Sequence, residues 1–320
     1  MGIMQLIDAH CHIHDPQYKF DVPAVLASAK AAGVTKMICV GTNVENSKQA
    51  VKFAAKHDDV FAAIGIYPHE KGDVRELETI LSLAPATATS GRSASPPSRV
   101  SSLKTRRNSD SPEIAVAGAN KQAASELSSS GNTPLGVGAN LPREDSSEVA
   151  ACNKIVAFGD IGLDYHYYPY SKKEQIAKLE QQLDLAQKYD LPVSFHVRDA
   201  FDDFWPVLAS FPRVRGVVHS FSDNLVNLDK ALSRGLYIGL NGIVTYRLTA
   251  DQAEVYAKVP LESMILETDS PYLTPASERG KINQPAYVKL VADWVALARD
   301  LAPEKVAKIT TKNAENLFGI

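Results

Sequence analysis

The chain has 320 residues, of which 45% are hydrophobic and 22% charged, and its formal net charge is −3, which fits one large globular domain or two ordinary ones. This small negative charge argues against a protein that coats nucleic acid broadly, and three cysteines, Cys11, Cys39 and Cys152, form no disulfide framework or zinc-ribbon spacing. No apolar run reaches the ~20 residues needed to cross a bilayer and the chain opens on no signal-peptide pattern, so we expect a reduced, cytoplasmic protein without a membrane partner.

Apolar runs typical of buried strands alternate with amphipathic segments typical of helices along the chain. The expected strands cover residues 6–7, 36–41, 60–65, 155–159, 193–196, 216–219, 236–240 and 264–268. The expected helices cover residues 22–32, 44–57, 74–83, 172–189, 201–211, 225–234, 250–258, 286–301 and 303–317. Eight such pairs predict an α/β fold, a closed TIM (β/α)8 barrel. A doubly wound open sheet is the alternative, but no glycine-rich phosphate turn follows the first strand.

One stretch, residues 84–153, interrupts the alternation and is dominated by Ser, Ala, Thr, Pro and Gly. Such a composition buries too little apolar surface to offset the entropy of ordering, so we predict a disordered insertion between the third helix and the fourth strand. Its basic cluster, residues 104–107, is either a solvated charge run or a contact for nucleic acid. Residues 1–83 and 154–320 then make one domain of about 250 residues, the usual size of a barrel.

Histidines and acids stand at the ends of several expected strands. They are His10 and His12 after the first strand, Asp160 after the fourth, His196 at the fifth, His219 at the sixth and Asp269 after the eighth. Two histidines separated by one residue of a strand point to the same face, so both rings can reach one cation. The carboxyl ends of barrel strands meet at one rim, and this pattern therefore predicts a divalent metal site there.

The motifs around these residues resemble those of the TatD family of metal-dependent deoxyribonucleases, within the amidohydrolase-like barrels. The resemblance covers residues 3–83 and 154–320. Its motifs are Asp8-Ala-His10-Cys-His12, Gly159-Asp160-Ile-Gly-Leu-Asp-Tyr165, His196-Val-Arg-Asp199, His219-Ser-Phe221, Leu266-Glu267-Thr-Asp269-Ser-Pro-Tyr272 and Arg279-Gly-Lys281-Ile-Asn283-Gln-Pro285. Any one of them is weak, but six in the same order are specific.

The resemblance implies a two-metal hydrolase. On the family's pattern, one cation is held by His10, His12 and Asp269 and the other by His196 and His219, with Asp160 as the bridging acid. The phosphate substrate favours Mg²⁺ or Mn²⁺ in the cell, and the imidazole-rich ligand set would also take Zn²⁺. Asp269, Asp160 and Glu267 are the predicted catalytic residues. Glu267 either orients a ligand or the water from behind, or fills the barrel interior, and the pattern leaves both open.

Cations, an amide and an aromatic ring are expected at the barrel mouth as contacts for the substrate. They are Arg198, Arg279, Lys281, Asn283 and Tyr165. Cations there would neutralise phosphates, and an aromatic ring would stack on a base. For Arg198 the alternative is a pair with Asp199 or a role in holding its loop.

The chain departs from the family pattern at three positions within the barrel. The bridging acid is usually Glu, whereas Asp160 is one methylene shorter. Tyr67 stands where the family usually has His, and His14 stands where an acid or amide is common. His14 is either an extra ligand or an ordinary loop histidine.

The function expected from this resemblance is metal-dependent cleavage of DNA, as an exonuclease on single-stranded or 3′ ends. The alternative is a two-metal hydrolase of another ester or amide bond, such as a D-aminoacyl-tRNA ester, because the fold does not fix the substrate. A binding scaffold without catalysis is the non-enzymatic alternative, and the set of five ligands besides Asp160 speaks against it. DNA is the partner that we expect, and the sequence points to no protein partner.

Overall fold

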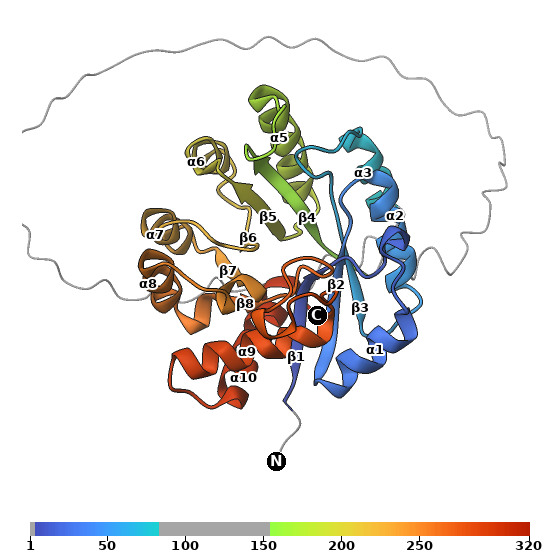
Figure 1. Ribbon diagram of the computed structural model, residues 1–320. Coiled ribbons are helices and arrows are strands. Elements are labelled where there is room, and N and C mark those ends of the chain that lie inside the picture. The colour runs from blue at the N-terminus through green and yellow to red at the C-terminus, as the bar shows by residue number, and fades with distance from the viewer. Residues whose placement is uncertain (1–3, 83–153) are drawn as a thin grey trace, which may run out of the picture. The chain divides into compact units, whose positions relative to one another are not determined.

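The computed structural model describes residues 4–82 and 154–320, in which eight parallel strands form a nearly closed barrel (Figure 1). The strands follow one another round the barrel in chain order. They are β1 (Leu6–Cys11), β2 (Val34–Val40), β3 (Val60–Ile64), β4 (Ile155–Asp164), β5 (Val193–Arg198), β6 (Gly216–Val218), β7 (Tyr237–Leu240) and β8 (Met264–Leu266). The predicted (β/α)8 barrel is confirmed. The insertion predicted over 84–153 lies outside the described residues, as does Cys152.

Helices lie around the strands (Figure 1). They are α1 (Val22–Ala31), α2 (Val44–Ala54), α3 (Val74–Ser82), α5 (Lys172–Lys188), α6 (Phe201–Ala209), α7 (Leu225–Ser233), α8 (Ala250–Lys258), α9 (Val288–Ala298) and α10 (Pro303–Phe318). Short 3₁₀ helices are η1 (Pro16–Tyr18), η3 (Gly242–Thr245), η4 (Leu261–Ser263), η5 (Ala276–Glu278) and η6 (Pro285–Tyr287). Polar side chains start several helices by accepting otherwise unpaired backbone N–H groups: Asn43 accepts from Asn46, and Thr249 forms a capping box with Gln252. In the described part of the chain, no helix combines the length and the apolar character needed to span a membrane.

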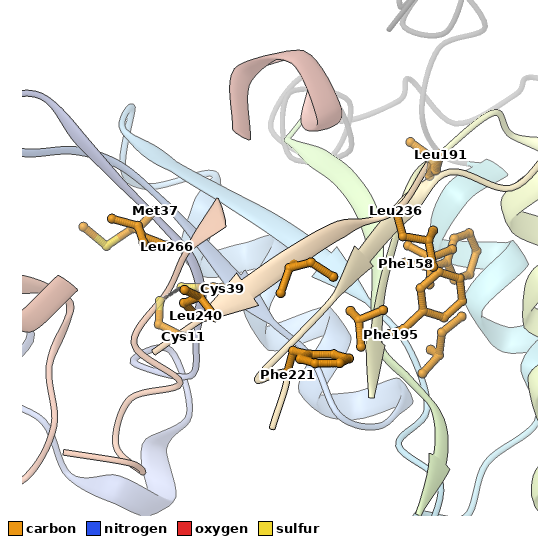
Figure 2. Close-up of a cluster of buried hydrophobic side chains, with 14 of the residues drawn as sticks. Cys11, Met37, Cys39, Phe158, Leu191, Phe195, Phe221, Leu236, Leu240 and Leu266 are labelled. Carbon is orange, nitrogen blue, oxygen red and sulfur yellow. Dashed lines mark hydrogen bonds between the residues drawn. The ribbon is translucent and has the colours of Figure 1, made fainter. Parts of the chain in front are cut away.

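Buried side chains form two layers, one on each side of the strands. The outer layer joins strands to helices, and Phe195 of β5, for example, contacts Phe204 of α6 with ring centroids 5.2 Å apart. Figure 2 shows part of this layer, including Phe158, Phe195 and Leu236. The inner layer contains Ile7, Ile38 and Ile265 of the strands together with Leu317 and Phe318 of α10.

α10 covers the amino-terminal end of the barrel. Its Asn313 donates to the carbonyls of Leu261, before β8, and of Met264, the first residue of β8, at 2.9 and 2.8 Å. Because this end is closed and the interior is filled with apolar side chains, only the carboxyl ends of the strands are left for polar chemistry.

The barrel closes where β1 meets the segment that follows β8. The amide of Asp269 donates to the carbonyl of His10, and the amide of His12 donates to the carbonyl of Ser270, both at 2.8 Å. Asp8 strengthens this seam, because its carboxylate accepts from the amide and the hydroxyl of Thr268 at 2.8 and 2.6 Å.

β1 and β4 are longer than the sequence predicted. β1 continues to Cys11 and β4 to Asp164, so their polar residues extend the strands rather than follow them. The apolar pattern understates both strands because inward-facing positions at the carboxyl end carry histidine and aspartate instead of apolar residues. The register of β4 against β5 shifts between Gly159 and Ile161, which leaves Asp160 as an extra residue at a bulge.

Candidate metal centre

His10 and His12 lie side by side at the end of β1, with their Nε2 atoms 3.3 Å apart. Each ring is held by its other nitrogen. His10 Nδ1 lies 3.2 Å from the hydroxyl of Ser194 on β5, and His12 Nδ1 donates to the carbonyl of Val40 on β2 at 2.7 Å. Because the Nδ1 atoms are engaged, both rings present Nε2 to the same space, as ligand histidines do.

His196 and His219 approach the same space from β5 and from the end of β6. His196 Nε2 donates to Asp164 of β4 at 3.0 Å, which leaves Nδ1 3.5 Å from Asp160. His219 Nδ1 donates to Glu267 at 3.0 Å, and its ring stacks on that of His10 with centroids 3.7 Å apart. Asp164 and Glu267 are fully buried, and each orients a histidine by bonding one ring nitrogen so that the other nitrogen is left for the cluster.

Asp160 stands between the two pairs of histidines. One ligand atom each of Asp160, His10 and His12 lie within 4.8 Å of one another, and the same holds for Asp160, His196 and His219. The bulge in β4 gives Asp160 a left-handed backbone with φ 56°, a conformation that Asp and Asn tolerate better than longer side chains. The Asp160 carboxylate thus lies within reach of ligand nitrogens from both pairs of histidines.

Asp269 completes the group from the β8 side. Its Oδ1 lies 3.4 Å from His12 Nε2 and 3.8 Å from His10 Nε2. Its backbone is also left-handed, with φ 58°, and its side chain is 14% exposed. Strained backbone of this kind at two acids of one cluster is typical of functional sites.

The electrostatics of the cluster suit a cation. Burial lowers the pKa of His10 well below its usual value, and the neighbouring His219 lowers it further, so the His10 ring stays neutral and can ligate. Burial disfavours ionised Asp160, but the hydrogen bond with His196 and the charges of the surrounding histidines together outweigh burial and lower its pKa.

Without a metal ion, His196 and His219 are expected to carry a proton at neutral pH. Burial disfavours the charged form of His196, but its hydrogen bonds with Asp160 and Asp164 raise its pKa to about 9. Burial acts in the same way on His219, and the charge of Glu267 raises its pKa to about 9. The second carboxylate oxygen of Glu267 is buried without a hydrogen-bond partner. The imidazoles and carboxylates of the cluster form a donor set that fits a divalent metal.

The residues predicted at the mouth have different environments. Arg198, Arg279 and Lys281 are exposed, and Lys281 pairs with Glu278 at 2.6 Å. The guanidinium of Arg279 lies over the ring of Tyr246, 5.1 Å from its centroid.

Asn283 and Tyr165 face the protein rather than the mouth. Asn283 is fully buried and donates to the carbonyls of Thr268 and Tyr272, so it holds the segment after β8 and has no exposed atom for a substrate. Tyr165 packs against the outer layer, and its hydroxyl donates to Asp203 of α6 at 2.9 Å.

Apart from Glu267, which bonds His219, sequence reasoning missed the side chains that hold the histidines. Ser194 and Asp164 are two of them, and both carry a signal: Ser194 lies two positions before His196 on the same face of β5, and Asp164 belongs to the motif of Asp160. Tyr67 is a third, since its hydroxyl donates to Asp164 at 2.5 Å. His14 lies apart from the cluster's ligand groups, with Nε2 3.1 Å from the side-chain oxygen of Asn46.

Comparison with known proteins gives a consistent result. The family described as TatD related DNase matches residues 7–319. A Bacillus subtilis protein described as the uncharacterized metal-dependent hydrolase YabD is 27% identical over 98% of this chain and 99% of its own. The 3′-5′ ssDNA/RNA exonuclease TatD of Salmonella typhimurium is 26% identical over 98% and 99%. The crystal structure of the TatD homologue YjjV from Escherichia coli K12 superposes with a TM-score of 0.73 at 27% identity, with 100% of both chains covered.

Proposed function

Because the chain belongs to the TatD-related DNase family, we propose that this metal-dependent hydrolase cleaves phosphodiester bonds of DNA, from the ends of single strands. One observation carries the proposal: four histidines and two aspartates from five strands bring their ligand atoms together at the open end of the barrel. Relatives named deoxyribonuclease Tat-D, in Schizosaccharomyces pombe, and 3′-5′ ssDNA/RNA exonuclease support the substrate class. A concave mouth accepts a flexible strand end more easily than a stiff duplex.

The proposed ligand sets follow the two pairs of histidines. His10, His12 and Asp269 would hold one divalent ion, His196 and His219 a second, and Asp160 would bridge them. Mg²⁺ or Mn²⁺ are the ions expected in the cell, and Zn²⁺ also suits the imidazoles. When bound, such ions lower the pKa of a water molecule and stabilise the departing oxygen.

The protein's own residues would orient the reactants and move the proton. Asp269, the most accessible acid of the cluster, would take the proton of the attacking water. Glu267, fully buried, would act from behind by holding His219. Arg198, Arg279 and Lys281 would bind backbone phosphates, and these exposed cations favour DNA over a small uncharged ester.

Cys11 and Cys39, free thiols 3.9 Å apart, agree with a reducing compartment such as the cytoplasm.

A nuclease assay with the purified chain tests this function. With Mg²⁺ or Mn²⁺ we expect mononucleotides to be released from single-stranded DNA labelled at either end, faster than from a blunt duplex, and release to stop in EDTA. Ester hydrolysis of D-aminoacyl-tRNA without release of nucleotides would contradict the proposal and favour the other ester substrate.

Tyr67→Phe tests the contact that replaces the family's usual histidine. Tyr67 donates to the same Asp164 oxygen that holds His196, so losing the hydroxyl should loosen that ring and lower turnover by about tenfold. The free energy of unfolding should fall by about 2 kcal/mol, the loss of one hydrogen bond to a charged acceptor. Tyr189→Phe is the matched control, since the Tyr189 hydroxyl also bonds a carboxylate, that of Glu78, which is not part of the histidine cluster. Equal turnover in both variants would show that the Tyr67 contact does not act on the centre.

A further inference from the structure

The inner face of β5 carries a row of polar residues that leads from the barrel interior to its mouth. Ser194, His196 and Arg198 alternate with the outward-facing Phe195 and Val197. Ser194 contacts His10, and His196 contacts Asp160, so both belong to the metal centre. Arg198 follows on the same face, about 6.6 Å further along the strand. A cation at this position can bind the part of a substrate that adjoins the bond to be cleaved.

Arg198 is held by a tyrosine rather than by an acid. Its Nη1 donates to the hydroxyl of Tyr167 at 3.0 Å, and the guanidinium lies over the Tyr167 ring, 5.0 Å from the centroid. Within residues 4–82 and 154–320 no carboxylate pairs with it, because the neighbouring Asp199 pairs with His166 at 2.9 Å. No ion pair therefore compensates the charge of Arg198 among these residues. The hydrogen bond and the cation–π contact with Tyr167 together fix the orientation of the guanidinium.

Tyr167 leaves part of its ring free for a ligand beside the guanidinium of Arg198. It is 54% exposed, although His69 and His166 contact it edge to face at 6.0 and 4.9 Å between centroids. A continuous series of ring contacts leads inward from it, from His69 to Tyr67 at 5.8 Å and from Tyr67 to His196 at 4.8 Å. Tyr165, the ring that the sequence suggested for stacking, is instead covered by Tyr170 and Lys172.

We propose that Tyr167 and Arg198 form a nucleotide subsite, in which the ring stacks on an unpaired base and the guanidinium binds the adjoining phosphate. This inference rests on the proposed function and specifies its substrate: a strand whose bases are free to leave the stack. An aromatic ring stacks on any base because every base has a π-face, and Arg adds charge without sequence preference. A base held in a duplex must unstack before it reaches the ring, so the subsite selects single strands.

The test measures binding with and without bases on the strand. A fluorescent single-stranded oligonucleotide and its stable abasic analogue, with identical phosphates, are titrated in EDTA with the full chain. Tyr167→Ala should weaken binding of the base-bearing strand roughly tenfold and that of the abasic strand much less. Arg198→Gln should weaken both equally and reduce the slope of log K against log salt by about 0.7, the value for one phosphate on a single strand.

Tyr168→Ala is the matched control, because Tyr168 is the adjacent tyrosine, is 88% exposed and, among the described residues, has its one ring contact with Tyr170. It should bind both strands like the parent chain. KM values with Mg²⁺ repeat the comparison for the loaded enzyme, and Tyr167→Ala should raise KM for the base-bearing strand with little change in kcat. Equal losses on both strands in Tyr167→Ala, or no loss in either variant, would overturn the subsite. A parent chain that hydrolyses neither strand would instead contradict the proposed function.

Discussion

Asp269→Asn is expected to reduce hydrolysis of single-stranded DNA by at least about 100-fold, the usual range for losing a group that transfers a proton in the transition state. Asp269 Oδ1 faces the free nitrogens of His10 and His12 at 3.8 and 3.4 Å, so its charge serves both the proposed ligation and the proton transfer. Asparagine has the same shape but neither the charge nor the basicity. Release of nucleotides, followed under substrate excess, measures the loss.

The same substitution should leave the fold intact. The Asp269 amide donates to the His10 carbonyl whichever side chain is present, and asparagine tolerates the left-handed backbone at φ 58°. The midpoint of thermal unfolding in EDTA should therefore change little. Asp300→Asn is the control, since Asp300 is exposed and has a similar backbone at φ 50° away from the cluster. Turnover near that of the parent chain in Asp269→Asn would contradict its role.

Divalent ions should stabilise the protein, and the effect should grow with pH. His196 and His219 both have a pKa of about 9 in the metal-free protein, so each carries a proton at neutral pH that a metal ion must displace. Affinity should rise about tenfold per pH unit for each proton released, and level off above pH 9. At 100 times the dissociation constant, binding adds about 2.7 kcal/mol to the free energy of unfolding.

Without a metal ion, the stability of the protein should instead fall as pH rises. Because both pKa values are raised above the ordinary 6.5, the stabilisation from these ion pairs is complete below pH 6.5 and is lost as pH rises through 9. Thermal unfolding in EDTA and in saturating Mn²⁺ between pH 6 and about 9.5 checks both trends. His57→Gln, a change at a ring that contacts Phe53, should leave them unaltered. A stabilisation by Mn²⁺ that is the same at both ends of this range would contradict the protonated histidines.

The barrel and the gathering of histidines and acids at its strand ends were predictable from the sequence because both follow from local patterns. Continuous apolar runs mark strands buried on both faces, and strand ends carry the polar residues. His10 and His12 come together through strand alternation alone. The convergence of these two with His196 and His219 needs only the closure of the barrel.

Contacts between strands were not predictable because they depend on register. The bulge that turns Asp160 inward comes from one residue of slip between β4 and β5. The pairing of Ser194 with His10 also requires knowing how far each strand extends. Tyr165 and Asn283 belong to motifs of the family, but the motif does not tell which face of the chain each side chain takes, and both turned toward the protein.

The seam that joins the first strand to the segment after the eighth has a consequence for synthesis of the enzyme. Asp269 meets His10 and His12 only when residues about four fifths of the chain apart in sequence have come together. A nascent polypeptide on the ribosome therefore carries an incomplete set of ligands until the last quarter of the protein has emerged. On the proposed function, nucleic acids near the ribosome would be hydrolysed only by finished molecules.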